Sequence, residues 1–127
     1  MPTVLIADDS MFQRLMLAKI VKAQGLDVLE AKNGQECLDQ IRAHAPALIL
    51  LDLNMSVLSG LGVLETVQQE SLPVKIIVIT ADIQETTRQR CLGLGAAMIL
   101  SKPVKESDVL AALHTVMAGD KDGTCPA

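Results

Sequence analysis

Apolar residues along the chain fall into five short runs, each followed by a longer stretch with apolar residues at helical spacing. Three of the runs, V-L-I-A, L-I-L-L and I-I-V-I, are apolar at every position instead of alternating. Continuous apolar runs of this length are typical of parallel strands covered by helices on both faces. The pattern predicts strands at residues 3–7, 27–31, 47–51, 75–79 and 96–100.

The segments between and after these strands predict helices at residues 11–24, 34–43, 61–70, 83–93 and 105–118. Two helix starts carry a recognisable cap. Asn33 with Glu36, and Asp82 with Glu85, match the capping box, in which two side chains satisfy the free amides of the first turn.

This alternation of strands and helices predicts an α/β fold with a doubly wound, five-stranded parallel sheet. The 127 residues have the length of one domain, which we expect at residues 1–118. Residues 119–127 are rich in Gly, Asp, Lys and Pro, and we expect them to form a flexible C-terminal tail. In such sheets ligands bind beyond the carboxyl ends of the strands, so functional side chains should directly follow strands.

Composition excludes several function classes. The net charge of −4, with no Lys/Arg cluster, argues against direct binding of nucleic acid. Phe12 is the only aromatic residue, which disfavours base stacking and flavin binding. No apolar run approaches the roughly 18 residues of a membrane helix, and no secretory signal is visible, so we expect a cytoplasmic location and no membrane partner. The three cysteines lack a C-x-x-C pair, which indicates reduced thiols.

Polar side chains follow four of the predicted strands, at the edge where ligands bind. They are Asp8 and Asp9 after the first strand, Asp52 and Asn54 after the third, Thr80 after the fourth and Lys102 after the fifth. Taken singly, an Asp after a strand most often caps a turn or helix, and a Lys is most often solvated. Their joint placement at one edge of one sheet is what indicates a site.

Three carboxylates at one edge repel each other and require a cation. Mg²⁺ is the natural candidate, because it takes carboxylates together with phosphate oxygens, and a carbonyl near Asn54 would add a ligand. The Lys102 ammonium and the Thr80 hydroxyl would complete the surroundings of a phosphoryl group. Asp52 stands alone after the central strand and is therefore the predicted nucleophile, forming an aspartyl phosphate.

In order along the chain, D-D-S with Arg14, L-D-L-N-M with Gly60, I-T-A, and G-A-A-M-I-L-S-K-P resemble the receiver domains of two-component response regulators. The resemblance, to the chemotaxis-regulator type, covers residues 3–117. It implies a flavodoxin-like (β/α)5 fold with strand order 2-1-3-4-5. It also implies a stand-alone signalling module and not a conventional enzyme.

The resemblance further implies that Asp52 accepts a phosphoryl group from the phosphohistidine of a sensor histidine kinase or phosphotransfer protein. It implies Mg²⁺ bound directly by Asp9 and Asp52, by Asn54 through its carbonyl, and by Asp8 through water. A downstream protein target, not identified by the sequence, would read the phosphorylated state.

For the remaining positions the resemblance implies a switch hydroxyl at Thr80, a phosphate contact at Lys102 and a cis bond before Pro103. The switch surface is expected around the fourth helix, the fifth strand and the fifth helix, and it includes Ala81, Ile99, Pro103, Glu85, Arg88, Gln89 and Lys105. Two positions depart from the family pattern: Ser56 replaces a usual Pro, and Ile99 replaces the Tyr or Phe of many receivers.

Alternative functions differ in what the aspartyl phosphate is for. A phosphorelay intermediate or phosphate sink would pass the group on without its own output, and the sequence does not separate this from a switch. A hydrolase of small phosphorylated substrates is disfavoured because it would need a D-x-D pair after the first strand. A flavodoxin is disfavoured because Asp8 and Asp9 would repel a flavin phosphate. An inactive binding module is disfavoured because the site residues are all present.

Overall fold

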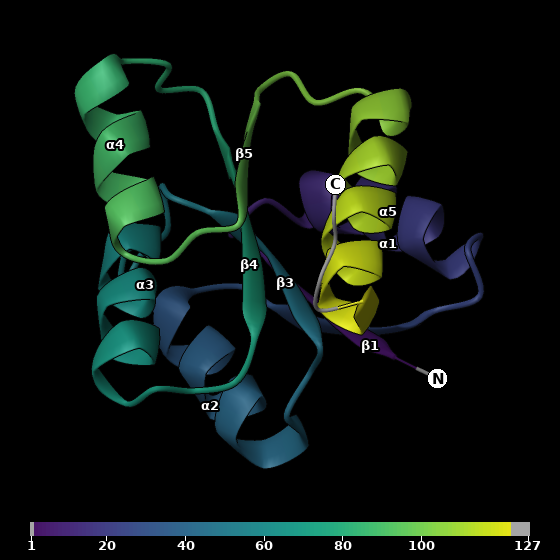
Figure 1. The fold of residues 1–127 in the computed structure, drawn as a ribbon, viewed down its shortest axis with the longest axis horizontal. Coiled ribbons are helices and arrows are strands. Elements are labelled where there is room, and N and C mark those ends of the chain that lie inside the picture. The colour runs from purple at the N-terminus through teal and green to yellow at the C-terminus, as the bar shows by residue number, and fades with distance from the viewer. Residues whose placement is uncertain (1, 123–127) are drawn as a thin grey trace.

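The computed structural model describes residues 2–122 (Figure 1). Five strands form one parallel sheet with the order β2-β1-β3-β4-β5, which confirms the predicted flavodoxin-like α/β fold. The strands are β1 (Thr3–Ala7), β2 (Asp27–Ala31), β3 (Leu48–Asp52), β4 (Lys75–Thr80) and β5 (Met98–Ser101). The helices are α1 (Met11–Lys22), α2 (Gly34–His44), α3 (Gly60–Gln69), α4 (Glu85–Gly93) and α5 (Glu106–Asp122).

The three continuous apolar runs are the three central strands. Every residue of β3 is buried, and β1 and β4 are buried after their first residue, whereas the edge strands β2 and β5 are largely half-exposed or exposed. A central strand contacts helices on both faces, so it needs apolar side chains on both. This requirement explains why the prediction from continuous runs was correct.

Helices cover both faces of the sheet (Figure 1). On one face α2, α3 and α4 bury a cluster that includes Cys37, Leu64 and Cys91. On the other face α1 and α5 bury a second cluster that includes Leu17 and Leu113. The two apolar layers fix the sheet between them, which leaves the carboxyl ends of the strands as the edge where polar side chains can gather.

Each helix differs from its predicted range by one or two residues at an end, and the last helix by four at its C-terminal end. The capping box at Asp82 was wrong: α4 begins at Glu85, its N-cap is Gln84, and that cap makes no side-chain hydrogen bond. The last helix extends to Asp122, past its predicted end at residue 118. The remainder of the predicted flexible tail, residues 123–127, lies outside the described residues.

The other predicted cap is present. The Asn33 side chain accepts a hydrogen bond from the Glu36 amide at 2.8 Å, and Glu36 in turn accepts from the amide of Lys32. The described cysteines Cys37 and Cys91 are free and buried, as expected of reduced thiols. Within residues 2–122, no helix is both long and apolar enough to cross a membrane.

Candidate functional site

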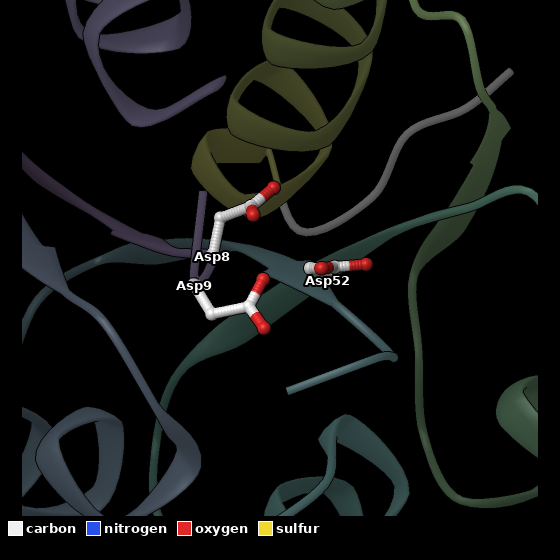
Figure 2. A group of neighbouring side chains, drawn as sticks. All are labelled: Asp8, Asp9 and Asp52. Atoms are coloured by element: carbon white, nitrogen blue, oxygen red, sulfur yellow. The ribbon is translucent and has the colours of Figure 1, made fainter. Parts of the chain in front are cut away.

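Three carboxylates converge at the carboxyl edge of the sheet (Figure 2). Asp8 and Asp9 directly follow β1, Asp52 ends β3, and β1 and β3 are hydrogen-bonded neighbours. One oxygen from each carboxylate lies within 4.8 Å of the others. Asp8 and Asp52 are buried, with 2% and 4% of their surface exposed, whereas Asp9 is open to solvent. The adjacency of the two strands therefore produces the acidic cluster predicted from the sequence.

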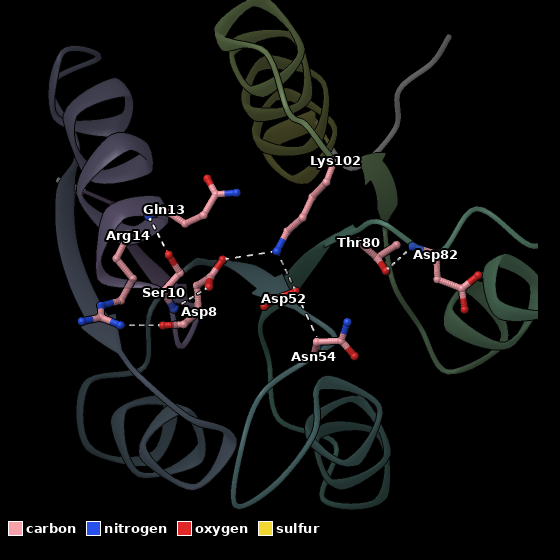
Figure 3. A network of polar contacts seen from close by, with 9 residues as sticks. All are labelled: Asp8, Ser10, Gln13, Arg14, Asp52, Asn54, Thr80, Asp82 and Lys102. Carbon is pink, nitrogen blue, oxygen red and sulfur yellow. Dashed lines mark hydrogen bonds and ion pairs between the residues drawn. The ribbon is translucent and has the colours of Figure 1, made fainter.

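Lys102 extends over this cluster from the end of β5 (Figure 3). Its Nζ lies 3.1 Å from Asp52 Oδ1 and 3.8 Å from Asp8 Oδ2. The backbone amide of Lys102 donates to the Thr80 carbonyl at 2.9 Å, which ties the start of the β5–α5 loop to the end of β4. One ammonium facing three carboxylates leaves a formal charge of −2 at the site.

The electrostatics of the cluster are most visible at Asp8. Burial raises the pKa of its carboxyl above the usual value, and the neighbouring Asp52 and Asp9 carboxylates act in the same direction. The Ser10 amide, which donates to Asp8 Oδ1 at 2.9 Å, and the Lys102 ammonium act in the opposite direction. Burial and the neighbouring negative charges therefore both disfavour ionisation of Asp8, and a bound cation would lower the Asp8 pKa again.

The donor set fits a hard divalent cation. Three carboxylate oxygens close together are ligands of the kind that Mg²⁺ takes, and the residual charge of −2 is what a divalent ion neutralises. The backbone amide of Asn54 donates to Asp52 Oδ1 at 3.3 Å, so Asn54 lies beside the same carboxylate. The cluster is consistent with the metal site of receiver domains.

Thr80, the last residue of β4, is buried, and its hydroxyl begins a short chain of hydrogen bonds, of which the bond to Asp82 is drawn in Figure 3. Thr80 Oγ1 accepts from the Asp82 amide at 3.0 Å. The Asp82 carboxylate accepts from the Gln84 amide at 3.0 Å and from the Thr87 hydroxyl at 2.7 Å, and the Thr87 bond is the larger of two causes that lower the Asp82 pKa. Asp82 thus ties Thr80 to α4, and its carboxylate bonds the Gln84 amide and the Thr87 hydroxyl instead of the Glu85 amide that the predicted capping box requires.

The expected switch surface is only partly brought together. Ile99 lines a small hollow of about 90 Å³ together with Thr80, Arg88 and three other residues of the β4–α4 and β5 region. Ala81 and Pro103 are exposed on either side of this region, and the Lys102–Pro103 bond is cis, as the resemblance implied. The Arg88 amide donates to the Gln84 carbonyl at 3.1 Å, whereas its guanidinium makes no hydrogen bond or ion pair within the described part of the chain.

The loop between β3 and α3 approaches the Asp52 backbone closely. A side chain at Gly60 would place its Cβ 2.5 Å from the Asp52 carbonyl oxygen and 2.7 Å from Leu53 Cα, so this position requires glycine. Val57, in the same loop, has a φ of 68° and is 79% exposed. A β-branched residue is strained in that left-handed region.

Two residues beside the cluster were not predicted to contribute to the site. Arg14 of α1 donates from Nη1 to the Asp8 carbonyl oxygen at 2.7 Å and from Nε to Glu30 Oε1 at 3.2 Å. The sequence pattern identifies Arg14 only as part of a motif and does not identify Glu30. The signal for Glu30 lies in the parallel register, which pairs it with Ile6 of β1 and so places it near the start of the Asp8 loop.

Comparisons with known proteins agree with this site. Residues 4–114 match the response regulator receiver domain. The chemotaxis protein CheY of Bacillus subtilis is 29% identical over 115 residues, covering 90% of this chain and 96% of that protein. The chemotaxis protein CheY of Thermotoga maritima is 32% identical over 114 residues, covering 89% and 95%. The transcription regulator BvgA of Bordetella pertussis is 33% identical over 117 residues, which are 91% of this chain but 56% of that protein.

Solved structures show the same likeness. The chemotaxis protein CheY4 of Vibrio cholerae has a TM-score of 0.85 and 28% identity, with 91% of this chain and 98% of that chain covered. A CheY-like receiver domain protein from Methanospirillum hungatei, at 22% identity and a TM-score of 0.91, shares the fold over 98% of this chain and 99% of that chain. Receiver domains are phosphoacceptor signalling modules that partner with histidine kinases and are not conventional enzymes. The chain belongs to the response regulator receiver domain family.

Proposed function

We propose that this protein is a phosphorylation-controlled interaction switch in which Asp52 accepts a phosphoryl group from a sensor histidine kinase or phosphotransfer protein. One observation carries the proposal. Asp52 is a buried carboxylate whose Oδ1 lies 3.1 Å from an ammonium, within a cluster of three carboxylates at the ligand-binding edge of the sheet. A carboxylate so placed has both a partner for phosphoryl oxygens and a site for a divalent cation.

The transfer forms one bond and breaks one. A carboxylate oxygen of Asp52 attacks phosphorus, the phosphorus–nitrogen bond of the donor phosphohistidine breaks, and its electron pair returns to the imidazole, which takes up a proton. Mg²⁺, held by Asp9 and Asp52 directly, by the Asn54 carbonyl and by Asp8 through water, would neutralise charge on the phosphoryl oxygens. Lys102 already contacts Asp52 and would move its ammonium to the new phosphoryl group.

The switch begins at Thr80. When its hydroxyl donates to the phosphoryl group, the hydrogen bond from the Asp82 amide is strained or lost. Asp82 is bonded to the first turns of α4, so the change reaches the surface that contains Ala81, Ile99 and Pro103. A protein partner that prefers one arrangement then shifts the population toward it.

We place this role in the cytoplasm and assign the output to chemotaxis. The support for chemotaxis is the match of the chain to almost the full length of two proteins named as chemotaxis proteins, from Bacillus subtilis and Thermotoga maritima. Deletion of the gene in its source organism, followed by a swimming assay, tests the assignment. Normal migration up an attractant gradient would contradict it and leave the phosphoacceptor proposal intact.

Phosphorylation is tested with a labelled small-molecule phosphodonor such as acetyl phosphate. Wild-type protein should incorporate label in Mg²⁺ and not in excess EDTA, and the label should be sensitive to hydroxylamine, as an acyl phosphate is. Asp52→Asn should abolish labelling. Asp27→Asn is the matched control, because Asp27 is exposed at the start of β2 and far from the cluster in the sheet. Unchanged labelling of Asp52→Asn would refute the proposal.

The same labelled protein separates a switch from a relay. Mixed with a phosphotransfer domain that carries an unmodified histidine, a switch should retain its label until hydrolysis. Rapid transfer of the label to that histidine would instead establish the relay function.

A further inference from the structure

Arg14 forms two contacts that meet at the loop carrying the metal ligands. Its Nη1 donates to the carbonyl oxygen of Asp8 at 2.7 Å, and its Nε donates to Glu30 Oε1 at 3.2 Å (the Asp8 contact is drawn in Figure 3). The Arg14 side chain is only 14% exposed and its contact with the Asp8 carbonyl is partly buried, whereas the Glu30 side chain is 39% exposed. The guanidinium thus joins three elements: α1, the end of β2 and the loop after β1.

The carbonyl that Arg14 holds belongs to the peptide between Asp8 and Asp9. This peptide is planar, so fixing its oxygen fixes the orientation of the plane and hence the direction in which Asp9 leaves the backbone. The two carboxylates differ in what restrains them. The Asp8 carboxylate accepts the Ser10 amide and contacts Lys102, whereas the Asp9 carboxylate accepts no hydrogen bond from any residue in the described range.

We propose that Arg14 is a positioning residue for the cation site, acting through the Asp8–Asp9 peptide, and that Glu30 acts by fixing the guanidinium. The inference rests on the Mg²⁺ site of the proposed function. Asp9 is held in place by backbone orientation alone, so its contribution to cation binding depends on that peptide. The planar guanidinium of Arg14 donates to the Asp8 carbonyl and to the Glu30 carboxylate at the same time. A lysine ammonium on its flexible side chain does not reproduce this geometry.

The sign of the effect on Mg²⁺ affinity distinguishes positioning from simple charge. Removing a positive charge near three carboxylates makes the site more negative, so electrostatics alone predicts that Arg14→Gln binds Mg²⁺ more tightly. Loss of positioning predicts weaker binding. Residues that orient metal ligands typically contribute about 10- to 100-fold in affinity, so positioning should dominate.

The test is calorimetric titration of unphosphorylated protein with MgCl₂ alone, for wild type, Arg14→Gln, Arg14→Lys and Glu30→Gln. We expect the dissociation constant to rise about 10-fold or more in both Arg14 variants and less in Glu30→Gln, which keeps an acceptor for Nε. At saturating Mg²⁺, labelling of Arg14→Lys by acetyl phosphate should return to the wild-type rate. This split between affinity and maximal rate would not follow from a general loss of structure.

Arg42→Gln is the matched control. It also removes an Arg–Glu pair between two elements, the 2.8 Å contact with Glu70, but that pair joins the C-terminal ends of α2 and α3, away from the cluster. Its Mg²⁺ affinity should equal that of wild type. Equal weakening in Arg42→Gln and Arg14→Gln, or unchanged or tighter binding in Arg14→Gln, would overturn the inference. A wild-type protein that binds no Mg²⁺ would instead refute the cation site of the proposed function.

Discussion

Replacing Asp9 by Asn should stabilise the metal-free protein. Asp9 lies within 4.8 Å of two like charges, and Coulomb's law gives about 3.5 kcal/mol for each pair at an effective dielectric constant near 20, or about 0.9 kcal/mol in water. Asp9 is exposed, which favours the lower figure. The Asp9 carboxylate accepts no hydrogen bond from the described residues, so replacing it by the Asn side chain breaks no hydrogen bond. The Lys102 ammonium beside the cluster offsets about one of the two repulsions, so we expect a gain of about 1 kcal/mol in the free energy of unfolding.

The same substitution should remove the stabilisation that Mg²⁺ provides. Ligand that binds only the native state stabilises it by about 2.7 kcal/mol at a concentration 100 times its dissociation constant. Asp9→Asn lacks one direct ligand of the proposed site and should gain much less. The order of stability then reverses with metal: the variant is more stable in EDTA, and wild type is at least as stable in saturating Mg²⁺.

The assay is urea unfolding followed by circular dichroism, in EDTA and in a series of MgCl₂ concentrations. Asp27→Asn is the control, because it removes one exposed carboxylate with no partner in the cluster and should unfold like wild type under every condition. The reasoning fails if Asp9→Asn is no more stable than wild type in EDTA. It also fails if Mg²⁺ stabilises the variant as much as wild type.

Three further perturbations test local features. Gly60→Ala should destabilise the protein by about 1–3 kcal/mol and slow phosphorylation, because the added Cβ would clash with the Asp52 backbone. The control is Gly93→Ala, which should not destabilise the protein because its Cβ would meet nothing within 4 Å. Val57→Asn should stabilise by about 1 kcal/mol in urea unfolding, because Asn tolerates the left-handed φ of 68° and Val does not; lower stability would contradict the strain argument. Burial raises the pKa of Cys37 from 9.0 to about 12, so the native state resists ionisation that the unfolded chain allows. The resulting stability is present below pH 9.0 and is lost as pH rises toward about 12; a series of unfolding curves across that window should show a steeper loss in wild type than in Cys37→Ala.

The fold was predictable where one physical requirement dominates. The central strands must be apolar on both faces, and the sequence shows this as the continuous apolar runs that form β1, β3 and β4. Boundaries were less predictable, because hydrogen bonding continues past the apolar residues. Asp52 was expected just after its strand but belongs to β3, where the ladder pairs it with Ile79.

The polar residues of the site were predictable for a related reason. In a parallel sheet the carboxyl ends of all strands share one edge, so Asp8, Asp52 and Lys102 had to approach each other whatever the details of packing. The supporting contacts had no such signal. Arg14 and Glu30 are 16 positions apart, and their contact depends on the register of β2 against β1 and on the position of α1.

Ile99 bears on how this receiver transmits its state. The family resemblance leads us to expect an aromatic ring there, whereas Ile99 is an aliphatic side chain packed against the core and lining a hollow beside Thr80. An aliphatic side chain has no polar atom that could follow the Thr80 hydroxyl. The described contacts offer another connection, because Thr80 accepts from Asp82 and Asp82 accepts from Gln84 and Thr87. In the proposed switch a change at the Thr80 hydroxyl therefore reaches α4 through hydrogen bonds, and no ring movement is needed.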